Sequence, residues 1–183
     1  MTEQHSSPMA APTSAPTSAP TSATIPNSDW PFQESYDEQR NQFQRSVFQA
    51  HPLVGHLDFQ YGDAKKGYFR IDIPWQENLS NYGQEMHGGI HAVLVDSVSG
   101  QAIYSLLKKD FGLSTVSLTT QYHRPFKKGV MKAEGWVTRW GRNVCHTQAR
   151  LSVDDVIIAE GSTVYSIFEH KKSQRSHWVK ERA

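Results

Sequence analysis

A pair of glycines and a single carboxylate are the residues of this sequence whose types and spacing point most directly to chemistry. Gly88 and Gly89 precede a long apolar segment, and Asp96 is the only charged residue within it. At the start of a helix the first backbone N–H groups lack intrahelical acceptors, and the peptide dipoles place partial positive charge there. A glycine lets another group approach those N–H groups closely. Such a helix start can stabilise a carbonyl oxygen that gains negative charge during a reaction.

Asp96 needs an explanation, because an unpaired carboxylate is costly to bury in an apolar segment. In helical projection it shares a stripe with small and apolar residues, namely Gly89, Ala92, Val93, Gly100 and Ile103. The stripe leaves space beside the acid, which could act as a general base or attack a carbonyl itself. Alternatively, Asp96 is a structural, hydrogen-bonded acid. The glycine pair favours the catalytic interpretation, whether the two parts meet within one chain or across a dimer.

Hydrophobic periodicity predicts the elements before this segment. Tyr36, Phe43 and Val47 share one face of an amphipathic helix. Residues 67–74 alternate apolar and polar side chains, which predicts a strand, and the apolar-rich residues 53–61 are its expected hairpin partner. One helix and two strands therefore precede the glycine pair.

The central segment, residues 90–107, is apolar on all sides, which predicts a buried helix. Four segments with period-two character follow, at residues 114–125, 130–140, 143–153 and 156–168. In the second of them, Trp136 and Trp140 are expected on one face. The connections are too short for parallel crossovers, so the sheet is antiparallel. The order predicts an α+β domain in which a curved antiparallel sheet encloses one long central helix.

The motif around these residues resembles that of a known family. The sequence His-Gly-Gly is followed after six residues by Asp96, Asn81 stands six residues before His87, and residues 122–125 read Tyr-His-Arg-Pro. This pattern is similar to that of the hotdog-fold acyl-CoA thioesterases. More narrowly, it resembles the branch that contains the PaaI-type and 4-hydroxybenzoyl-CoA thioesterases. The resemblance covers roughly residues 45–169.

The resemblance implies hydrolysis of an acyl-CoA thioester to free acid and CoA, with no cofactor and no metal. It assigns Asp96 as general base or nucleophile and the Gly88 amide as the group that polarises the thioester carbonyl. Asn81 matches a position that helps hold the carbonyl or the attacking water, and Thr115 matches a hydroxyl position near that water. It also implies sites at a subunit interface, in a homodimer or a tetramer of two dimers, with sheets joined edge to edge.

The two histidines of the motif allow a second interpretation. His87 and His91 stand four residues apart, a spacing that can place two imidazoles on one metal ion. The sequence suggests no third ligand, so no metal site is expected. We expect His87 to anchor the loop and, with Gly89, to contribute to substrate binding, while His91 lines the site or faces a neighbouring subunit.

Basic residues gather after the central helix, and coenzyme A carries phosphates that arginine and lysine can bind. The candidates for this role are Arg124, Lys127 and Arg142. Each is equally well explained as a solvated turn residue. We nevertheless expect these three residues to contact the substrate at the mouth of the acyl tunnel.

Composition limits the classes of function. The 183 residues carry 19 basic and 18 acidic side chains, a formal net charge of +1, which favours neither nucleic acid nor an anionic membrane as partner. Cys145 is the only cysteine, which excludes an internal disulfide framework and a cysteine-based zinc cluster. No apolar run is long enough to span a bilayer, and the N-terminus has no signal or transit pattern, so the expected location is the cytoplasm.

The chain divides into three expected parts. Residues 1–28 include three copies of Ala-Pro-Thr-Ser, a composition typical of a disordered leader. Residues 29–169 form the expected hotdog domain with its N-terminal helix. Residues 170–183 are strongly basic and are expected to be a solvated tail.

Two other functions fit the same fold. Acyl-thioester hydratases usually combine an acid with a histidine in a D-x-x-x-P-x-H arrangement, which this sequence lacks. A non-catalytic acyl-CoA-binding protein or sensor would not need Asn81, Gly88 and Asp96 together. Thioester hydrolysis is therefore the leading hypothesis. The apolar central helix suits medium or long aliphatic acyl groups, which we favour, and also aryl groups.

Overall fold

The computed structural model describes residues 38–108 and 110–170. The predicted leader, Tyr36 and the predicted tail beyond His170 lie outside the described residues. The elements are α1 (Glu38–Gln49), α2 (Pro52–Leu57), β1 (Gln60–Lys65), β2 (Tyr68–Pro74), η1 (Glu77–Leu79), α3 (Gly88–Tyr104), β3 (Phe111–Tyr122), β4 (Val130–Trp140), β5 (Val144–Val153) and β6 (Val156–Glu169).

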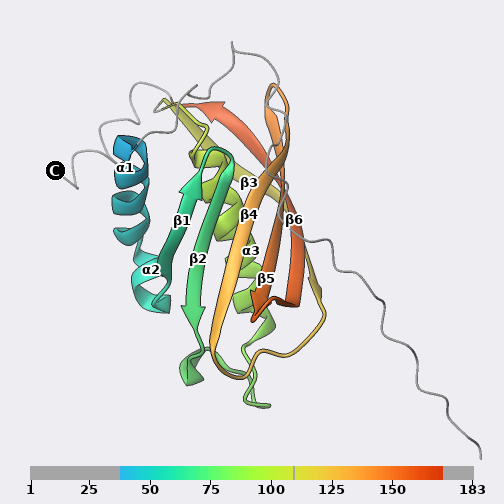
Figure 1. The fold of residues 1–183 in the computed structure, drawn as a ribbon. Helices are drawn as coiled ribbons and strands as arrows, with labels where there is room; N and C mark the ends of the chain where they lie inside the picture. Colours follow the sequence, from blue (N-terminus) through green and yellow to red (C-terminus); the bar gives the residue numbers. More distant parts are fainter. Residues whose placement is uncertain (1–37, 109, 171–183) are drawn as a thin grey trace, which may run out of the picture.

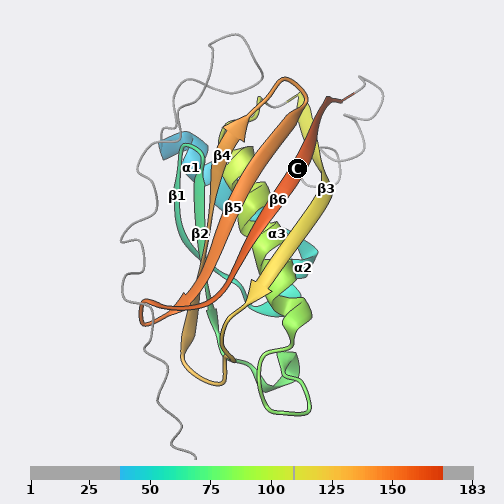
Figure 2. The ribbon, with the colours of Figure 1, turned by 90° about the vertical axis from the view of Figure 1, so that its right-hand side faces the viewer.

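The six strands form one antiparallel sheet in the order β1-β2-β4-β5-β6-β3. The sheet curves around α3, which contacts strands β2 to β6 (Figures 1 and 2). Strands β1 and β3 are its edges. The predicted α+β architecture, a curved antiparallel sheet around one long helix, is confirmed.

Two glycines bring α3 very close to the sheet. A Cβ on Gly135 in β4 would lie 2.6 Å from the carbonyl carbon of Val98, and one on Gly161 in β6 would lie 2.5 Å from Cγ1 of Val95. Real Cβ atoms do not approach neighbours this closely, so only glycine fits at these two positions. The middle of α3 is therefore held against β4 and β6 at the level of Asp96.

The N-terminal helix has a different buried face from the predicted one. Phe43 and Val47 are 51% and 40% exposed, whereas Phe48 and the polar Gln44 are buried. Phe48 packs on Phe69 of β2, with ring centroids 5.4 Å apart. Apolar periodicity could not find this face because a glutamine occupies it. Its amide donates a hydrogen bond of 2.7 Å to the carbonyl oxygen of a residue in α3.

The predicted strand over residues 53–61 is also wrong at its start. Residues 52–57 form helix α2, and β1 begins only at Gln60. His51 caps this helix, because its side chain accepts a hydrogen bond from the Leu53 N–H, and Pro52 occupies the first helical position, where proline is preferred. These local signals outweigh the apolar composition of the segment.

A β-bulge overturns the expectation that Trp136 and Trp140 share a face. The pairing of β4 with β5 shifts between Val137 and Arg139, so one extra residue separates the two tryptophans in the pleat. Trp140 belongs to the hydrophobic core, whereas Trp136 lines a hollow on the opposite face of the sheet.

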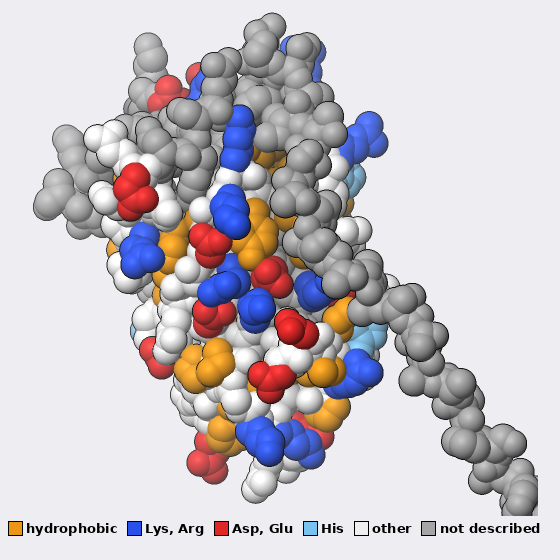
Figure 3. Space-filling model, in the orientation of Figure 1, with side chains coloured by type: hydrophobic (Ala, Val, Ile, Leu, Met, Phe, Trp, Pro, Cys, Tyr) orange, Lys and Arg blue, Asp and Glu red, His pale blue; other side chains and the backbone are white. Residues whose placement is uncertain are grey.

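The outer face of the sheet, turned away from α3, is a mosaic of positive and negative side chains (Figure 3). Arg70 pairs with Asp72 at 3.1 Å, and Arg150 pairs with Glu160 at 3.1 Å. Such alternation of apolar inward and polar outward residues is typical of an antiparallel sheet with one solvated face. Within the described residues, no helix combines the length and apolar character needed to cross a bilayer.

Candidate active site

Helix α3 begins with a free backbone donor. His87 is the N-cap, and its Nδ1 accepts a hydrogen bond of 2.9 Å from the Gly89 N–H. The Ile90 N–H is bonded to the His87 carbonyl oxygen. Among the described residues, no acceptor is bonded to the Gly88 N–H. This half-buried amide at the positive end of the helix dipole is therefore available to a ligand.

The ring of Tyr122, at the end of β3, covers the other side of Gly88. Its hydroxyl donates a hydrogen bond of 3.0 Å to the Gly88 carbonyl oxygen. A Cβ on Gly88 would lie 3.5 Å from this ring, which is an ordinary contact. The glycine is therefore not required by packing at this position, and the helix start is fixed to β3 by the tyrosine.

Asp96 is neither fully buried nor alone, which corrects the picture of a lone buried acid. It is half-buried on α3. Thr115 in β3 donates a hydrogen bond of 2.9 Å from Oγ1 to Oδ1 of Asp96. The pairing of β3 with β6 shifts between Thr115 and Ser117, and this bulge lies next to the threonine that reaches the acid. The structure thus brings two of the expected site residues together.

Tyr165 of β6 is a third residue in contact with Asp96, and it was not predicted from the sequence. Its hydroxyl lies 2.9 Å from Oδ1 and 2.7 Å from the carbonyl oxygen of Asp96. Burial, and then the neighbouring Asp96 carboxylate, raise the pKa of Tyr165. It stays a neutral hydrogen-bond donor at neutral pH. Only its inward position in an alternating strand was visible beforehand, and that position suggests ordinary core.

Asn81 is engaged in its own loop. Its Oδ1 accepts hydrogen bonds from the Gly83 N–H at 2.8 Å and the Glu85 N–H at 3.3 Å, and its backbone N–H donates to the Glu85 carbonyl oxygen. This arrangement shapes the turn that leads to the helix start, as asparagine side chains often do. Within the described residues of one protomer, Asn81 makes no hydrogen bond to Asp96.

His91 lies buried beneath the helix start. It is 3% exposed, neither ring nitrogen has a hydrogen-bond partner within the described residues, and its ring meets that of Tyr122 edge-on at 5.8 Å. Burial lowers the pKa of His91, so the imidazole is neutral at neutral pH. The described residues contain no cluster of three or more metal-ligating side chains.

The three basic candidates lie in different places. Lys127 forms an ion pair of 3.1 Å with Glu85 in the loop before α3, and Arg124 donates a hydrogen bond to the Ile157 carbonyl oxygen. Both belong to the end of the molecule where α3 begins. Arg142 is in the β4–β5 turn, at the opposite end of the sheet (Figure 1). It does not reach the Gly88 region of its own protomer.

Helix geometry separates the two central groups. Gly88 and Asp96 are eight residues apart on one continuous helix, which corresponds to about 12 Å along its axis. One thioester carbonyl cannot contact a donor and a carboxylate placed so far apart. The Gly88 amide and the Asp96 carboxylate of the same protomer therefore do not form one site.

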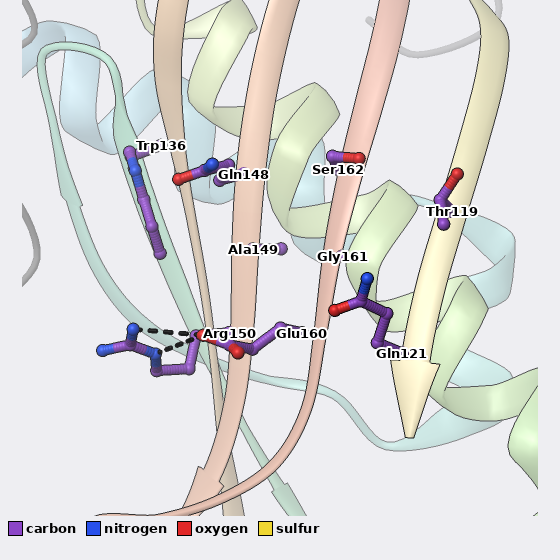
Figure 4. A pocket seen from close by; sticks show the side chains of 9 residues that line it. All are labelled: Thr119, Gln121, Trp136, Gln148, Ala149, Arg150, Glu160, Gly161 and Ser162. Atoms are coloured by element: carbon purple, nitrogen blue, oxygen red, sulfur yellow. Dashed lines mark hydrogen bonds and ion pairs between the residues drawn. The ribbon is translucent and has the colours of Figure 1, made fainter. Parts of the chain in front are cut away.

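A separate polar hollow lies on the outer face of the sheet (Figure 4). Gly161 faces Val95 of α3, so its neighbour Glu160 points to the other side of the sheet. Arg150 donates from its guanidinium to Oε1 of Glu160, and His123 lies 3.4 Å from Oε2. The Arg150 guanidinium and the Glu160 carboxylate offset each other's charge, and the residues that line the hollow include neither Gly88 nor Asp96.

Comparison with known sequences agrees with the motif. The family model of the thioesterase superfamily matches residues 83–159. A relative from Halobacterium salinarum, named "Putative esterase", is 35% identical over 105 residues, which are 55% of this chain and 69% of the relative. A relative of the same description from Saccharolobus solfataricus is 26% identical over 111 residues, which are 61% of this chain and 69% of the relative.

Solved structures show the same fold. The PaaI protein of the phenylacetic acid degradation operon of E. coli superposes with a TM-score of 0.67 and 15% identity, over 75% of this chain and 99% of that one. A thioesterase family protein from Silicibacter pomeroyi gives a TM-score of 0.66 with 20% identity, over 70% and 98% of the two chains. The family model matches the segment that contains the helix start and Asp96, and the halobacterial relative is 35% identical to the chain. The chain therefore belongs to the thioesterase superfamily of hotdog-fold proteins.

Proposed function

We propose that this hydrolase cleaves acyl-CoA thioesters to a free acid and CoA. The observation that carries the proposal is the free Gly88 N–H at the start of α3, combined with an Asp96 carboxylate that hydroxyl groups hold in place. The first group suits a developing oxyanion, and the second suits an attacking water or carbonyl carbon. The Gly88 N–H and the Asp96 carboxylate together provide the oxyanion donor and the base or nucleophile needed to hydrolyse a thioester.

In the proposed reaction the thioester carbonyl oxygen accepts a hydrogen bond from the Gly88 amide. Asp96 then removes a proton from water as the water oxygen bonds to the carbonyl carbon. The tetrahedral intermediate collapses, the C–S bond breaks, and the thiolate leaves and is protonated. In the alternative route Asp96 bonds to the carbonyl carbon first, the thiolate leaves, and water hydrolyses the resulting anhydride. Asn81 and Thr115 are proposed to help hold the carbonyl or the water.

The separation of Gly88 from Asp96 supports a site shared between two subunits. A helix that is apolar on all sides is expected to be buried all round, yet Val93 and Asp96 on α3 remain half-exposed in one protomer. Among the described residues, strand β3 has no neighbour on its outer edge, and its Val116 is 64% exposed. Pairing of two β3 edges in a homodimer would cover that edge and let two α3 helices face each other. A tetramer of two such dimers is the alternative assembly.

Substrate contacts follow from the same arrangement. His87 and Gly89 shape the helix start, and Arg124 and Lys127 flank it, so these residues are proposed to contact the CoA portion. Arg142 could contribute only from another subunit. Half-exposed apolar side chains of α3 are proposed to line the acyl site, which favours medium or long aliphatic chains and also accommodates aryl groups.

The test is thiol release from a panel of acyl-CoAs, with short, medium and long aliphatic, phenylacetyl and benzoyl groups. Wild type and Asp96→Asn are compared side by side. We expect wild type to turn over at least one substrate, and the variant to be slower by about a hundredfold or more, the scale for losing a general base. If purified wild-type protein binds acyl-CoA but releases no thiol from any of the panel, a binding protein replaces the enzyme.

A further inference from the structure

The hydroxyl of Tyr165 contacts two oxygens of a single residue. It lies 2.7 Å from the carbonyl oxygen of Asp96 and 2.9 Å from Oδ1 of the same residue. A carbonyl oxygen and a carboxylate oxygen both accept hydrogen bonds, so the hydroxyl must be the donor. The ring is 1% exposed within the core, and its hydroxyl lies beside Gly100 of α3. The donor is therefore rigidly placed.

The two oxygens of the Asp96 carboxylate differ as a result. Oδ1 receives the Thr115 hydroxyl at 2.9 Å and the Tyr165 hydroxyl at 2.9 Å. Among the described residues, no hydrogen-bond donor contacts Oδ2. Hydroxyl donors from two strands, β3 and β6, thus fix one oxygen and leave the other free.

We infer that Tyr165 is a positioning residue for Asp96, and that its hydroxyl holds Oδ1 so that Oδ2 is presented to water or to the thioester carbon. The inference rests on the proposed function, in which Asp96 reacts. A hydrogen bond to an ionised carboxylate stabilises its charged form. When Oδ2 takes a proton, the Tyr165 proton still has the Asp96 carbonyl oxygen as an acceptor.

The chain offers a matched control for this role. Tyr68 of β2 also donates from its hydroxyl to a carboxylate, with 2.6 Å between the hydroxyl and Oε1 of Glu134. This pair is formed between neighbouring strands and does not involve α3. Tyr68→Phe removes the same chemical contact as Tyr165→Phe without touching Asp96.

The experiment measures kcat, KM and the pH dependence of kcat/KM for wild type, Tyr165→Phe and Tyr68→Phe on the best acyl-CoA of the panel. We expect Tyr165→Phe to lower kcat by about 10- to 100-fold, the scale for losing a hydrogen bond to a charged group. We expect KM to change by less than about twofold, because the contact does not bind substrate. The acidic limb of the pH profile should move to higher pH, since the ionised acid loses a donor. Tyr68→Phe should match wild type in all three.

A double variant tests whether the effect passes through Asp96. In the Asp96→Asn background, Tyr165→Phe should cause little further loss of kcat, because the two residues act as a unit. A further loss as large as in the wild-type background would overturn the inference. So would a folded Tyr165→Phe protein with the kcat and acidic limb of wild type.

Should Tyr165→Phe fail to fold, 3-fluorotyrosine at position 165 keeps the shape and makes the hydroxyl a stronger donor. The acidic limb should then move to lower pH, and an unmoved limb would overturn the inference. A separate result would show that the proposed function is wrong: an Asp96→Asn protein that hydrolyses acyl-CoA as fast as wild type does. Turnover that is lost in Asp96→Asn but unaffected by changes at position 165 would remove only the role of Tyr165.

Discussion

The backbone of Gly135 in β4 lies directly against the backbone of Val98 in α3. A Cβ at Gly135 would be 2.6 Å from the Val98 carbonyl carbon and carbonyl oxygen, and 2.8 Å from the Ser99 nitrogen. These are backbone atoms in the middle of a buried helix, which cannot move aside as a flexible side chain would. The position of α3, and with it of Asp96, therefore depends on the absence of a side chain in β4.

Gly135→Ala is expected to destabilise the fold by about 1–3 kcal/mol, the range for overpacking a core. The control is Gly55→Ala in α2, where a Cβ meets nothing within 4 Å. Alanine there should raise stability by about 0.4–1 kcal/mol, because it restricts the unfolded chain. Chemical denaturation measures both. Equal stability of Gly135→Ala and wild type would mean that α3 does not lie against β4 at this point.

The buried His91 predicts a pH dependence of stability. Burial lowers the pKa of His91 below the ordinary value of 6.5 in the folded state. Just below pH 6.5, His91 therefore binds a proton more readily in the unfolded chain than in the folded chain. Stability is thus unaffected above about pH 6.5 and falls as the pH drops below it, by at most about 1.4 kcal/mol per pH unit.

His91→Leu should reduce the fall in the free energy of unfolding below about pH 6.5, the ordinary pKa of histidine. Chemical denaturation at a series of pH values on both sides of this pKa measures the effect. At pH 8 the variant should be no less stable than wild type, since it also removes two buried nitrogens without partners. His56→Gln, at an exposed position in α2, serves as the control and should keep the wild-type slope. An unchanged slope in His91→Leu would exclude His91 as its source.

Much of the sheet could be predicted from alternation alone. Phe69, Ile71 and Ile73 are the inward residues of β2, as their spacing indicates, and all three are fully buried. The turn at Asp154 and Asp155 was recognisable from its composition. Both residues have positive φ, which suits the tight hairpin between β5 and β6. These features are local, so a short stretch of sequence contains them.

The parts that escaped prediction depend on distant contacts. Gln44 is buried because it meets a partner 57 positions later in the chain, and Tyr165 reaches Asp96 across 69 positions. The second contact also depends on strand register, which bulges alter and which alternation does not reveal. Thr115 was found only through the family resemblance.

The role proposed for the Gly88 amide can be tested by removing its N–H donor. Gly88 is the first residue of α3, where proline is favoured, and His87 has φ −59° and ψ 133°, a conformation that suits a residue before proline. Gly88→Pro therefore deletes the N–H while preserving the helix. We expect kcat to fall by about 100- to 1000-fold, the scale for losing an oxyanion donor.

Gly88→Ala is the matched control for this variant. It keeps the N–H, and its Cβ makes an ordinary contact of 3.5 Å with Tyr122. It should fold as wild type does and lose much less activity than Gly88→Pro. If the proline and alanine variants have equal kcat, the Gly88 amide does not polarise the carbonyl.

Mixed dimers test whether each site takes its amide from one subunit and its acid from the other. Gly88→Pro and Asp96→Asn homodimers should both be inactive, because every site lacks one group. A dimer containing one chain of each kind has one site with the intact amide and the intact acid, and one with neither. The isolated mixed dimers should therefore show about half of wild-type activity, since one of their two sites is complete. The two variants are co-expressed with different tags, and the doubly tagged dimers are isolated and assayed for thiol release. If the mixed dimers are no more active than either homodimer, both groups of a site lie on the same subunit. That result would contradict the separation of about 12 Å between Gly88 and Asp96, eight residues apart along α3.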